Sequence, residues 1–250
     1  MGLVSFITGL FGFGSSTEVV DSRANKGDVT ASAPDDHLDH AYIRGNIENH
    51  GPCPGLNSLA NQGWINRDGK NITPVQVETA LKNILHMSSP LASSLANMLK
   101  QVTRADGTFD LVDVRKHNVL EHDASFTRHD AIQGDNFTFQ PALFEALLKD
   151  AEGGPLTIKS LAKTFRRRHQ ESRAAGSPPM SIRLWFIHLG EAVALFHAAQ
   201  GGNELPLDVV RTFYLEERFP EMILKNKNTR TMLGLTRDVV ALWFRVVFKF

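Results

Sequence analysis

The chain has 250 residues, of which 42% are hydrophobic, and its 27 basic and 27 acidic residues give a formal net charge of zero at pH 7. This balance argues against a general nucleic-acid-binding protein, whose affinity rests on excess positive charge. Since no run of about 18 apolar residues occurs, the sequence predicts no transmembrane segment.

The amino-terminal segment, residues 1–34, mixes Gly, Ser, Asp and Ala without a sustained period, which predicts a flexible leader before a domain over residues 35–250. Its apolar beginning is typical of a signal sequence, but no Lys or Arg precedes Arg23, so the basic region of a signal peptide is missing. Two glycosylation sequons, at Asn71 and Asn136, fit secretion. Localisation and oligomeric state therefore stay open.

Helical patterns dominate the domain. The clearest one begins at Thr73, which can cap a helix, with Pro74 in the first turn and Gln76 at the capping-box spacing. Similar signals start helices at Ser89-Pro90, Pro141, Thr157, Ser181 and Pro206. Residues 238–248 are compatible with helix or strand, and alternating strand patterns of useful length are absent elsewhere. The sequence therefore predicts a single all-α domain.

The only cysteine, Cys53, lies between two prolines that restrict its backbone. A single thiol can form neither an intrachain disulfide nor a four-cysteine metal site. With Pro54 at a first helical position, Cys53 would lie at a helix N-terminus, where unpaired amides favour a thiolate, the form that binds iron. A buried, inert cysteine is the alternative, and the residues alone leave the two nearly balanced.

A second candidate site is the cluster Glu121-His122-Asp123-Ala124-Ser125. Its carboxylate, hydroxyl and carbonyl oxygens are hard ligands that suit Mg²⁺ or Ca²⁺. Taken alone, the cluster is more typical of a solvated acidic turn in which Asp123 or Ser125 caps the next element.

A third candidate is Glu191, which lies in the apolar segment from Leu184 to Phe196. Desolvation on such a helix raises the pKa of a carboxylate and suits it to general acid–base chemistry. The alternatives are a solvent-facing Glu and one paired with Arg183. The basic cluster Arg166-Arg167-Arg168-His169 is interpreted as a solvated helix face.

Together these sites resemble one family. The stretch from Pro52 to Gly63 and the following Asn66-Arg67-Asp68-Gly69 resemble the signature of the fungal haem-thiolate peroxidases, which include chloroperoxidase and the short unspecific peroxygenases. The cluster 121–125 is similar to the family's Glu-His-Asp-x-Ser motif, and Gly190-Glu191 resembles its distal acid–base position. The likeness covers about residues 40–219.

His122 places the chain with the shorter branch, because the longer peroxygenases typically have Glu-Gly-Asp and an arginine that assists the glutamate. The chain departs from the family at two points. Gln62 stands where histidine is common in the family, and the leader is longer than expected.

The resemblance implies that Cys53 is the thiolate ligand of haem b (iron protoporphyrin IX). Under this interpretation the amides of Leu56, Asn57 and Ser58 contact the sulfur. Glu121, the His122 carbonyl and Ser125 would hold Mg²⁺ together with a haem propionate.

On the other face of the haem, the resemblance implies that Glu191 is the acid–base residue and that the His122 side chain orients it. Helical spacing then predicts that Ile187, Ala194 and Leu195 line the pocket. The implied activity is hydrogen-peroxide-dependent insertion of oxygen into C–H or C=C bonds of small apolar or aromatic compounds, with oxidation of halides or phenols as further reactions.

Two other functions stay open at the level of sequence. A haem-thiolate protein without turnover, such as a redox sensor, would use the same cysteine but would not need Glu191. A cysteine hydrolase would pair Cys53 with His122 or His188 and would contain no haem.

Overall fold

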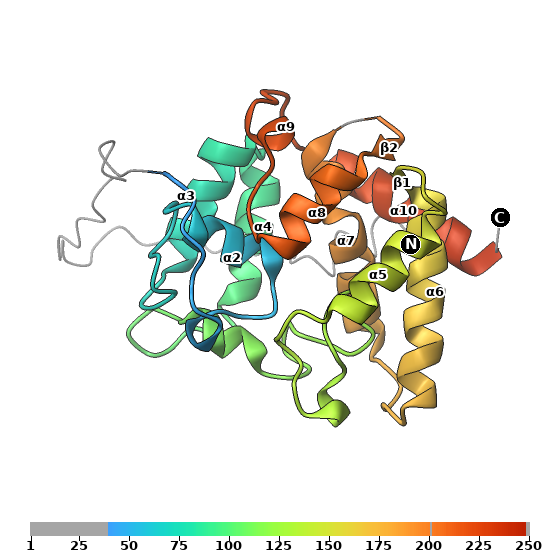
Figure 1. The fold of residues 1–250 in the computed structure, drawn as a ribbon. Helices are drawn as coiled ribbons and strands as arrows, with labels where there is room; N and C mark the ends of the chain where they lie inside the picture. Colours follow the sequence, from blue (N-terminus) through green and yellow to red (C-terminus); the bar gives the residue numbers. More distant parts are fainter. Residues whose placement is uncertain (1–39, 201, 249–250) are drawn as a thin grey trace, which may run out of the picture.

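The computed structural model describes residues 40–200 and 202–248, so the predicted leader lies outside the described residues. Within that part of the chain, helices account for nearly all regular structure, which confirms the all-α prediction (Figure 1). The α-helices are α2 (Pro54–Asn61), α3 (Pro74–Leu85), α4 (Ser89–Leu99), α5 (Pro141–Asp150), α6 (Ile158–Ala174), α7 (Ile182–Ala199), α8 (Leu207–Leu215), α9 (Glu221–Leu224) and α10 (Met232–Phe248). The shorter elements are the 3₁₀ helices η1 (Ile47–Asn49), η2 (Leu111–Arg115) and η3 (Ala131–Gln133), and the strands β1 (Leu156–Thr157) and β2 (Glu204–Leu205).

The start of α3 follows directly from its sequence. The Thr73 hydroxyl accepts the Gln76 N–H at 3.2 Å, and the Gln76 carboxamide oxygen accepts the Thr73 N–H at 2.8 Å. This reciprocal capping box satisfies two backbone donors that have no partner within the helix. The helix ends at Leu85, where His86 takes a left-handed φ of 46°.

The structure decides two features that the sequence patterns left open or did not predict. Residues 238–248 belong to the helix α10, whose buried Leu235, Val239 and Leu242 follow a helical period and pack against α6 and α7. The strands β1 and β2 form a short antiparallel ladder in which Leu156 faces Leu205. Two residues per strand are too few to produce an alternating pattern, so the sequence could not predict this ladder.

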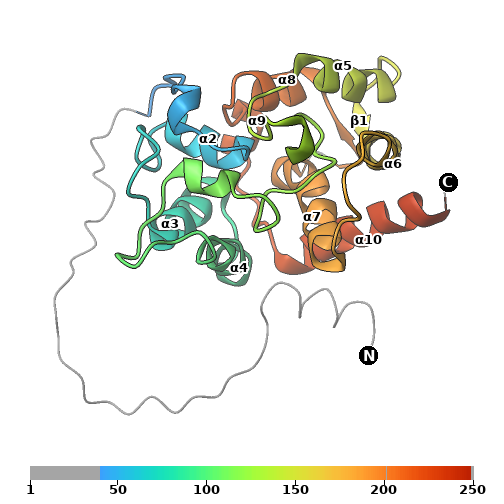
Figure 2. The ribbon, with the colours of Figure 1, turned by 90° about the horizontal axis from the view of Figure 1, so that it is seen from below.

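Helix α7 lies between two groups of helices. Figures 1 and 2 show α2, α3 and α4 on one side of α7, and α6 and α10 on the other. Helix α7 is long and apolar enough to cross a membrane, but 72% of that stretch is buried inside the fold. A central core helix has the same composition. This placement puts the predicted acid–base residue Glu191 on the side of the helix group that includes α2, which begins after Cys53.

Candidate active site

Cys53 is the N-cap residue of α2, and Pro54 occupies the first helical position. Burial raises the pKa of the Cys53 thiol to about 11, while the backbone amides of Leu56 and Gly55 act in the opposite direction. The amides at the helix terminus therefore lower the pKa of Cys53, but this effect is smaller than the increase caused by desolvation, so the terminus by itself does not produce a thiolate. A coordinated metal ion would deprotonate the thiol outright.

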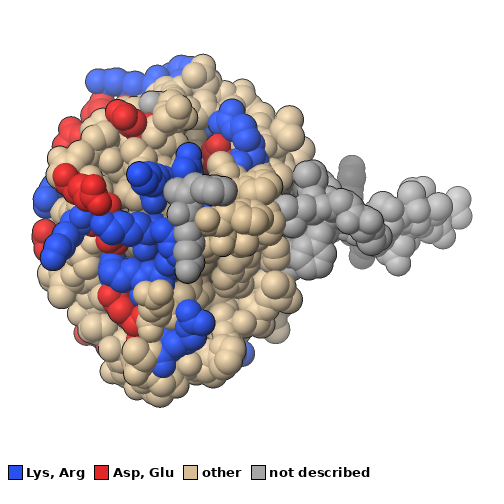
Figure 3. Space-filling view, turned by 90° about the vertical axis from the view of Figure 1, so that its right-hand side faces the viewer, with Lys and Arg blue, Asp and Glu red and all other residues tan. Residues whose placement is uncertain are grey.

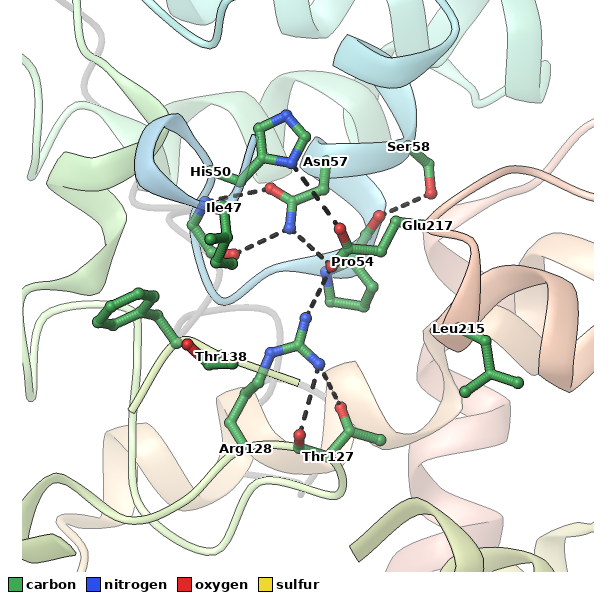
Figure 4. A network of polar contacts seen from close by, with 12 residues as sticks. Ile47, His50, Pro54, Asn57, Ser58, Thr127, Arg128, Thr138, Leu215 and Glu217 are labelled. Carbon is green, nitrogen blue, oxygen red and sulfur yellow. Dashed lines mark hydrogen bonds and ion pairs between the residues drawn. The ribbon is translucent and has the colours of Figure 1, made fainter. Parts of the chain in front are cut away.

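The loop before Cys53 is fixed by a buried polar network that centres on Glu217 (Figure 4). The Asn57 carboxamide bonds both the N–H and the carbonyl of Gly51, and its Nδ2 donates to Glu217 Oε1 at 2.8 Å. Arg128 Nη2 donates to the same oxygen at 2.8 Å, and His50 Nδ1 lies 3.8 Å from Glu217 Oε2. Because these side chains are all buried, the network holds the cysteine loop rigidly.

Neither Arg128 nor Glu217 was singled out by the sequence patterns. Both lie outside the recognised motifs, so only their burial and mutual contact reveal them. Asn57 and Ser58, which the resemblance placed near the sulfur, are fully buried, and their side chains bond backbone atoms. The Asn57 side chain therefore positions the loop, whereas the Ser58 hydroxyl bonds the Pro54 carbonyl within α2.

Glu191 projects from α7 and pairs with His122 at 3.0 Å between Oε2 and Nε2. The other ring nitrogen of His122, Nδ1, lies 2.7 Å from the Asp123 carbonyl, which fixes the ring. Burial alone would lower the pKa of His122, but the Glu191 carboxylate, aided by this carbonyl, raises it to about 9. The prediction that Glu191 is poorly solvated is wrong, because its side chain is 57% exposed.

Arg183, the alternative partner for Glu191, bonds elsewhere. Its Nη1 donates to the Val119 carbonyl and its Nη2 to the Gln101 side chain.

The turn that carries His122 is braced from α6. Ala124 takes a left-handed φ of 62°, and its N–H donates to Asp130 Oδ1. Arg168 donates from Nε to the Ser125 carbonyl at 2.7 Å and from Nη2 to Asp130 at 3.1 Å. The interpretation of the basic cluster as a solvated face is therefore wrong for Arg168, which is buried and supports the site.

The oxygen-rich cluster offers a partial cation site. Glu121 Oε2 pairs with His117 Nδ1 at 2.8 Å, whereas Oε1 is buried without a hydrogen-bond partner. The Ser125 hydroxyl donates to the His122 carbonyl oxygen at 3.1 Å, so these two oxygens lie about as far apart as the roughly 3 Å between neighbouring ligands of an octahedral Mg²⁺. Among the described residues, however, no group of three or more His, Cys, Asp or Glu is arranged to hold a metal ion.

Cys53 and Glu191 line the same two adjoining cavities, one of about 250 Å³ and one of about 180 Å³. Both cavities are also lined by Ala194 and Leu195, and the larger one by Ile187 and Leu56. The larger cavity has an apolar wall of Leu59, Val77, Leu81, Leu85, Leu91, Leu95 and Phe213.

The smaller cavity has a polar end. Glu121, Ser125 and Arg128 all line it, and Arg128 Nε is buried without a hydrogen-bond partner, like Glu121 Oε1. An apolar space with a thiol on its wall and unpaired polar atoms at one end suits haem, whose flat apolar ring carries two propionates. The residues present therefore fit this cofactor.

Fold and site together define a helical protein in which a proline-flanked thiol and a histidine-supported carboxylate face one cavity. Residues 40–229 match the family described as "Peroxidase, family 2". The chain belongs to this family, the fungal haem-thiolate peroxidases, and haem is the cofactor that the family implies.

Similar proteins carry related names. The chain is 27% identical over 213 residues to an aromatic peroxygenase of Cyclocybe aegerita, covering 74% of this chain and 57% of that protein. It is 30% identical over 217 residues to an aromatic peroxygenase of Coprinellus radians, covering 75% of this chain and 83% of that protein. It is 32% identical over 124 residues to a chloroperoxidase of Leptoxyphium fumago, covering 44% of this chain and 33% of that protein.

Proposed function

We propose that this haem-thiolate peroxidase is a peroxygenase, which uses hydrogen peroxide to insert oxygen into C–H or C=C bonds of small apolar or aromatic compounds. The observation that carries this proposal is that Cys53 and the Glu191–His122 pair face the same cavity. The names of two relatives, both aromatic peroxygenases, support the choice of reaction.

The residues of this chain have distinct roles in the proposed reaction. Cys53 would ligate the haem iron, and the bound haem would supply the redox chemistry that cleaves the peroxide O–O bond. Glu191 would take a proton from one peroxide oxygen and deliver it to the other, so that water leaves. Its exposed carboxylate has access to the cavity, and His122 holds it in position at 3.0 Å.

The lining of the larger cavity supports the proposed substrate class. Apart from Cys53, Glu191 and His197, its walls consist of apolar side chains and glycines. Such a surface favours apolar substrates because their transfer from water buries apolar area on both partners. Ile187, Ala194 and Leu195 would contact the substrate on the side of Glu191.

We further propose that Mg²⁺ binds at Glu121, the His122 carbonyl and Ser125. The unpaired Glu121 Oε1 and the spacing of the Ser125 and His122 oxygens support this site. A cation there would compensate the buried carboxylate, whose pKa burial raises against the opposing effect of His117.

A cysteine hydrolase is disfavoured by the geometry around the thiol. No hydrogen bond joins Cys53 to a histidine in the described part of the chain, and His122 is committed to Glu191 and Asp123. A nucleophilic cysteine needs an adjacent base or a lowered pKa, whereas burial raises the pKa of Cys53.

Product analysis with ¹⁸O-labelled hydrogen peroxide tests the proposed reaction. The haem-loaded protein is incubated with naphthalene, benzyl alcohol and a phenol, each with and without chloride or bromide. Oxygenated products that carry ¹⁸O are expected for naphthalene. Coupled phenols without any ¹⁸O-bearing product would show a peroxidase that does not transfer oxygen, and no product at all would indicate a haem protein without turnover.

A further inference from the structure

A second cavity, of about 430 Å³, lies outside the candidate active site. It is bounded by α6, by the segment 178–180, by the start of α7 at Trp185 and by α10 at Val246, and we call it the α6 groove. Among the described residues it shares no lining side chain with either cavity that contains Cys53. The groove therefore requires an explanation of its own.

The α6 groove is lined by two arginines, Arg166 and Arg173, and by one carboxylate, Asp123. Figure 3 shows many Lys and Arg side chains, with Asp and Glu side chains among them, on the face of the molecule that carries α6 and the end of α10. Among the residues that the structure describes, the Arg166 side chain donates to the Arg245 carbonyl and the Arg173 side chain to the His169 carbonyl. Neither guanidinium has an ion pair with a carboxylate in the described part of the chain.

Their neighbours on the same helix behave differently. Arg167 pairs with Asp150 and Glu171, and Arg168 pairs with Asp130 and Glu171. Asp130, Asp150 and Glu171 therefore pair with arginines that do not line the groove. Arg166 and Arg173, which do line it, keep N–H donors that no carboxylate of the described residues accepts.

One carboxylate, Asp123, also lines the groove, and its two oxygens face residues that do not line it. Asp123 Oδ1 accepts the Ala131 N–H at 2.9 Å, and its Oδ2 lies 3.6 Å from His117 Nε2. His169 also lines the groove, and burial lowers its pKa to about 4, so this ring is neutral at pH 7. The net positive charge of the groove at neutral pH therefore comes from Arg166 and Arg173.

The rest of the groove is aromatic and apolar. Trp185 is half-buried and meets the Phe165 ring edge-on, at 5.8 Å between centroids and 88° between planes. Pro178, Pro179 and Met180 form a further wall. A flat ring packed on such a surface gains from burial and from aromatic contact.

We propose that the α6 groove binds a small aromatic carboxylate, with its ring against Trp185 and its carboxylate between Arg166 and Arg173. Guanidinium groups match carboxylates because two parallel N–H donors meet two oxygens. The volume of about 430 Å³ falls within the range of small-molecule sites and suits a ligand with one ring. This site is independent of the proposed peroxygenase function, because it uses neither Cys53 nor Glu191.

Calorimetric titration of the full-length, haem-loaded protein with cinnamate tests the proposal, with the neutral cinnamamide as the matched ligand. We expect cinnamate to bind at one equivalent and at least about tenfold more tightly than cinnamamide, since charged hydrogen bonds contribute more than neutral ones. The Soret band of the haem is recorded in the same titration and should not follow the binding curve.

Variants locate the binding. Arg173→Gln removes an exposed guanidinium and should weaken cinnamate about tenfold, while the exposed Arg211→Gln removes the same charge elsewhere and should leave binding unchanged. Trp185→Leu should weaken cinnamate and cinnamamide together. Equal affinity for the two ligands, unchanged binding by Arg173→Gln, or a Soret shift that tracks the titration would each overturn the proposal.

Discussion

The two sides of the cavity are built differently. On the cysteine side, Asn57, Arg128 and Glu217 are 0%, 2% and 5% exposed and form one closed network. On the carboxylate side, the Glu191 side chain is 57% exposed and has one hydrogen-bond partner among the described residues, His122. An iron ligand must keep its position in all states, whereas a group that moves protons needs access to its substrate, so the contrast matches the two proposed tasks.

The largest expected effect comes from the cysteine itself. In Cys53→Ser a hydroxyl replaces the only thiol, so the proposed iron ligand is lost and peroxide-dependent turnover should disappear. The CO complex of the reduced, haem-loaded variant should lose the red-shifted Soret band of thiolate-ligated haem. A retained red-shifted band in a variant with native helix content would contradict the assignment of Cys53.

The carboxylate side is tested by Glu191→Gln, which keeps the shape of the side chain but cannot carry a proton. The rate of reaction with peroxide should fall about 10²–10⁴-fold, the usual contribution of a general acid–base group, while haem stays bound. Rapid mixing with peroxide measures the rate, and the exposed Glu145→Gln serves as the control. An unchanged rate would remove Glu191 from the mechanism.

The rigidity of the cysteine side predicts a difference between two neighbouring glutamates. Glu217→Ala leaves the buried Arg128 without its partner and should lower the free energy of unfolding by about 3–5 kcal/mol. Glu216→Ala breaks a half-exposed contact with Arg218 and should change this free energy by about 0–1 kcal/mol. Denaturant unfolding of both variants measures the difference, and equal effects would mean that the network does not hold the loop.

The proposed cation site predicts a smaller, local effect. Glu121→Gln removes the charged ligand and should weaken Mg²⁺ binding about tenfold or more. Metal analysis after dialysis of the haem-loaded protein measures the loss, again with Glu145→Gln as the control. Absence of Mg²⁺ from the well-loaded parent protein would contradict the site without affecting the roles of Cys53 and Glu191.

Local sequence predicted those parts of the fold that depend on nearby residues. The capping box at Thr73 and the helical spacing of apolar residues set α3, because both devices act within one or two turns. The proline-flanked Cys53 likewise placed the start of α2 correctly. The sequence pattern did not predict the end of α4, because the helix ends at Leu99 although the apolar spacing continues to Val102.

The sequence by itself determined the helical class, the candidate residues and, through resemblance, their family. Only the tertiary structure decided that Glu217 and Arg128 hold the cysteine loop, that Arg168 braces the turn of His122, and that Arg166 and Arg173 keep unpaired charges in the α6 groove. The physical reason is that a charged side chain has no periodic signature. Its role depends on which distant residue folding brings within hydrogen-bond reach and on how much water remains around the pair.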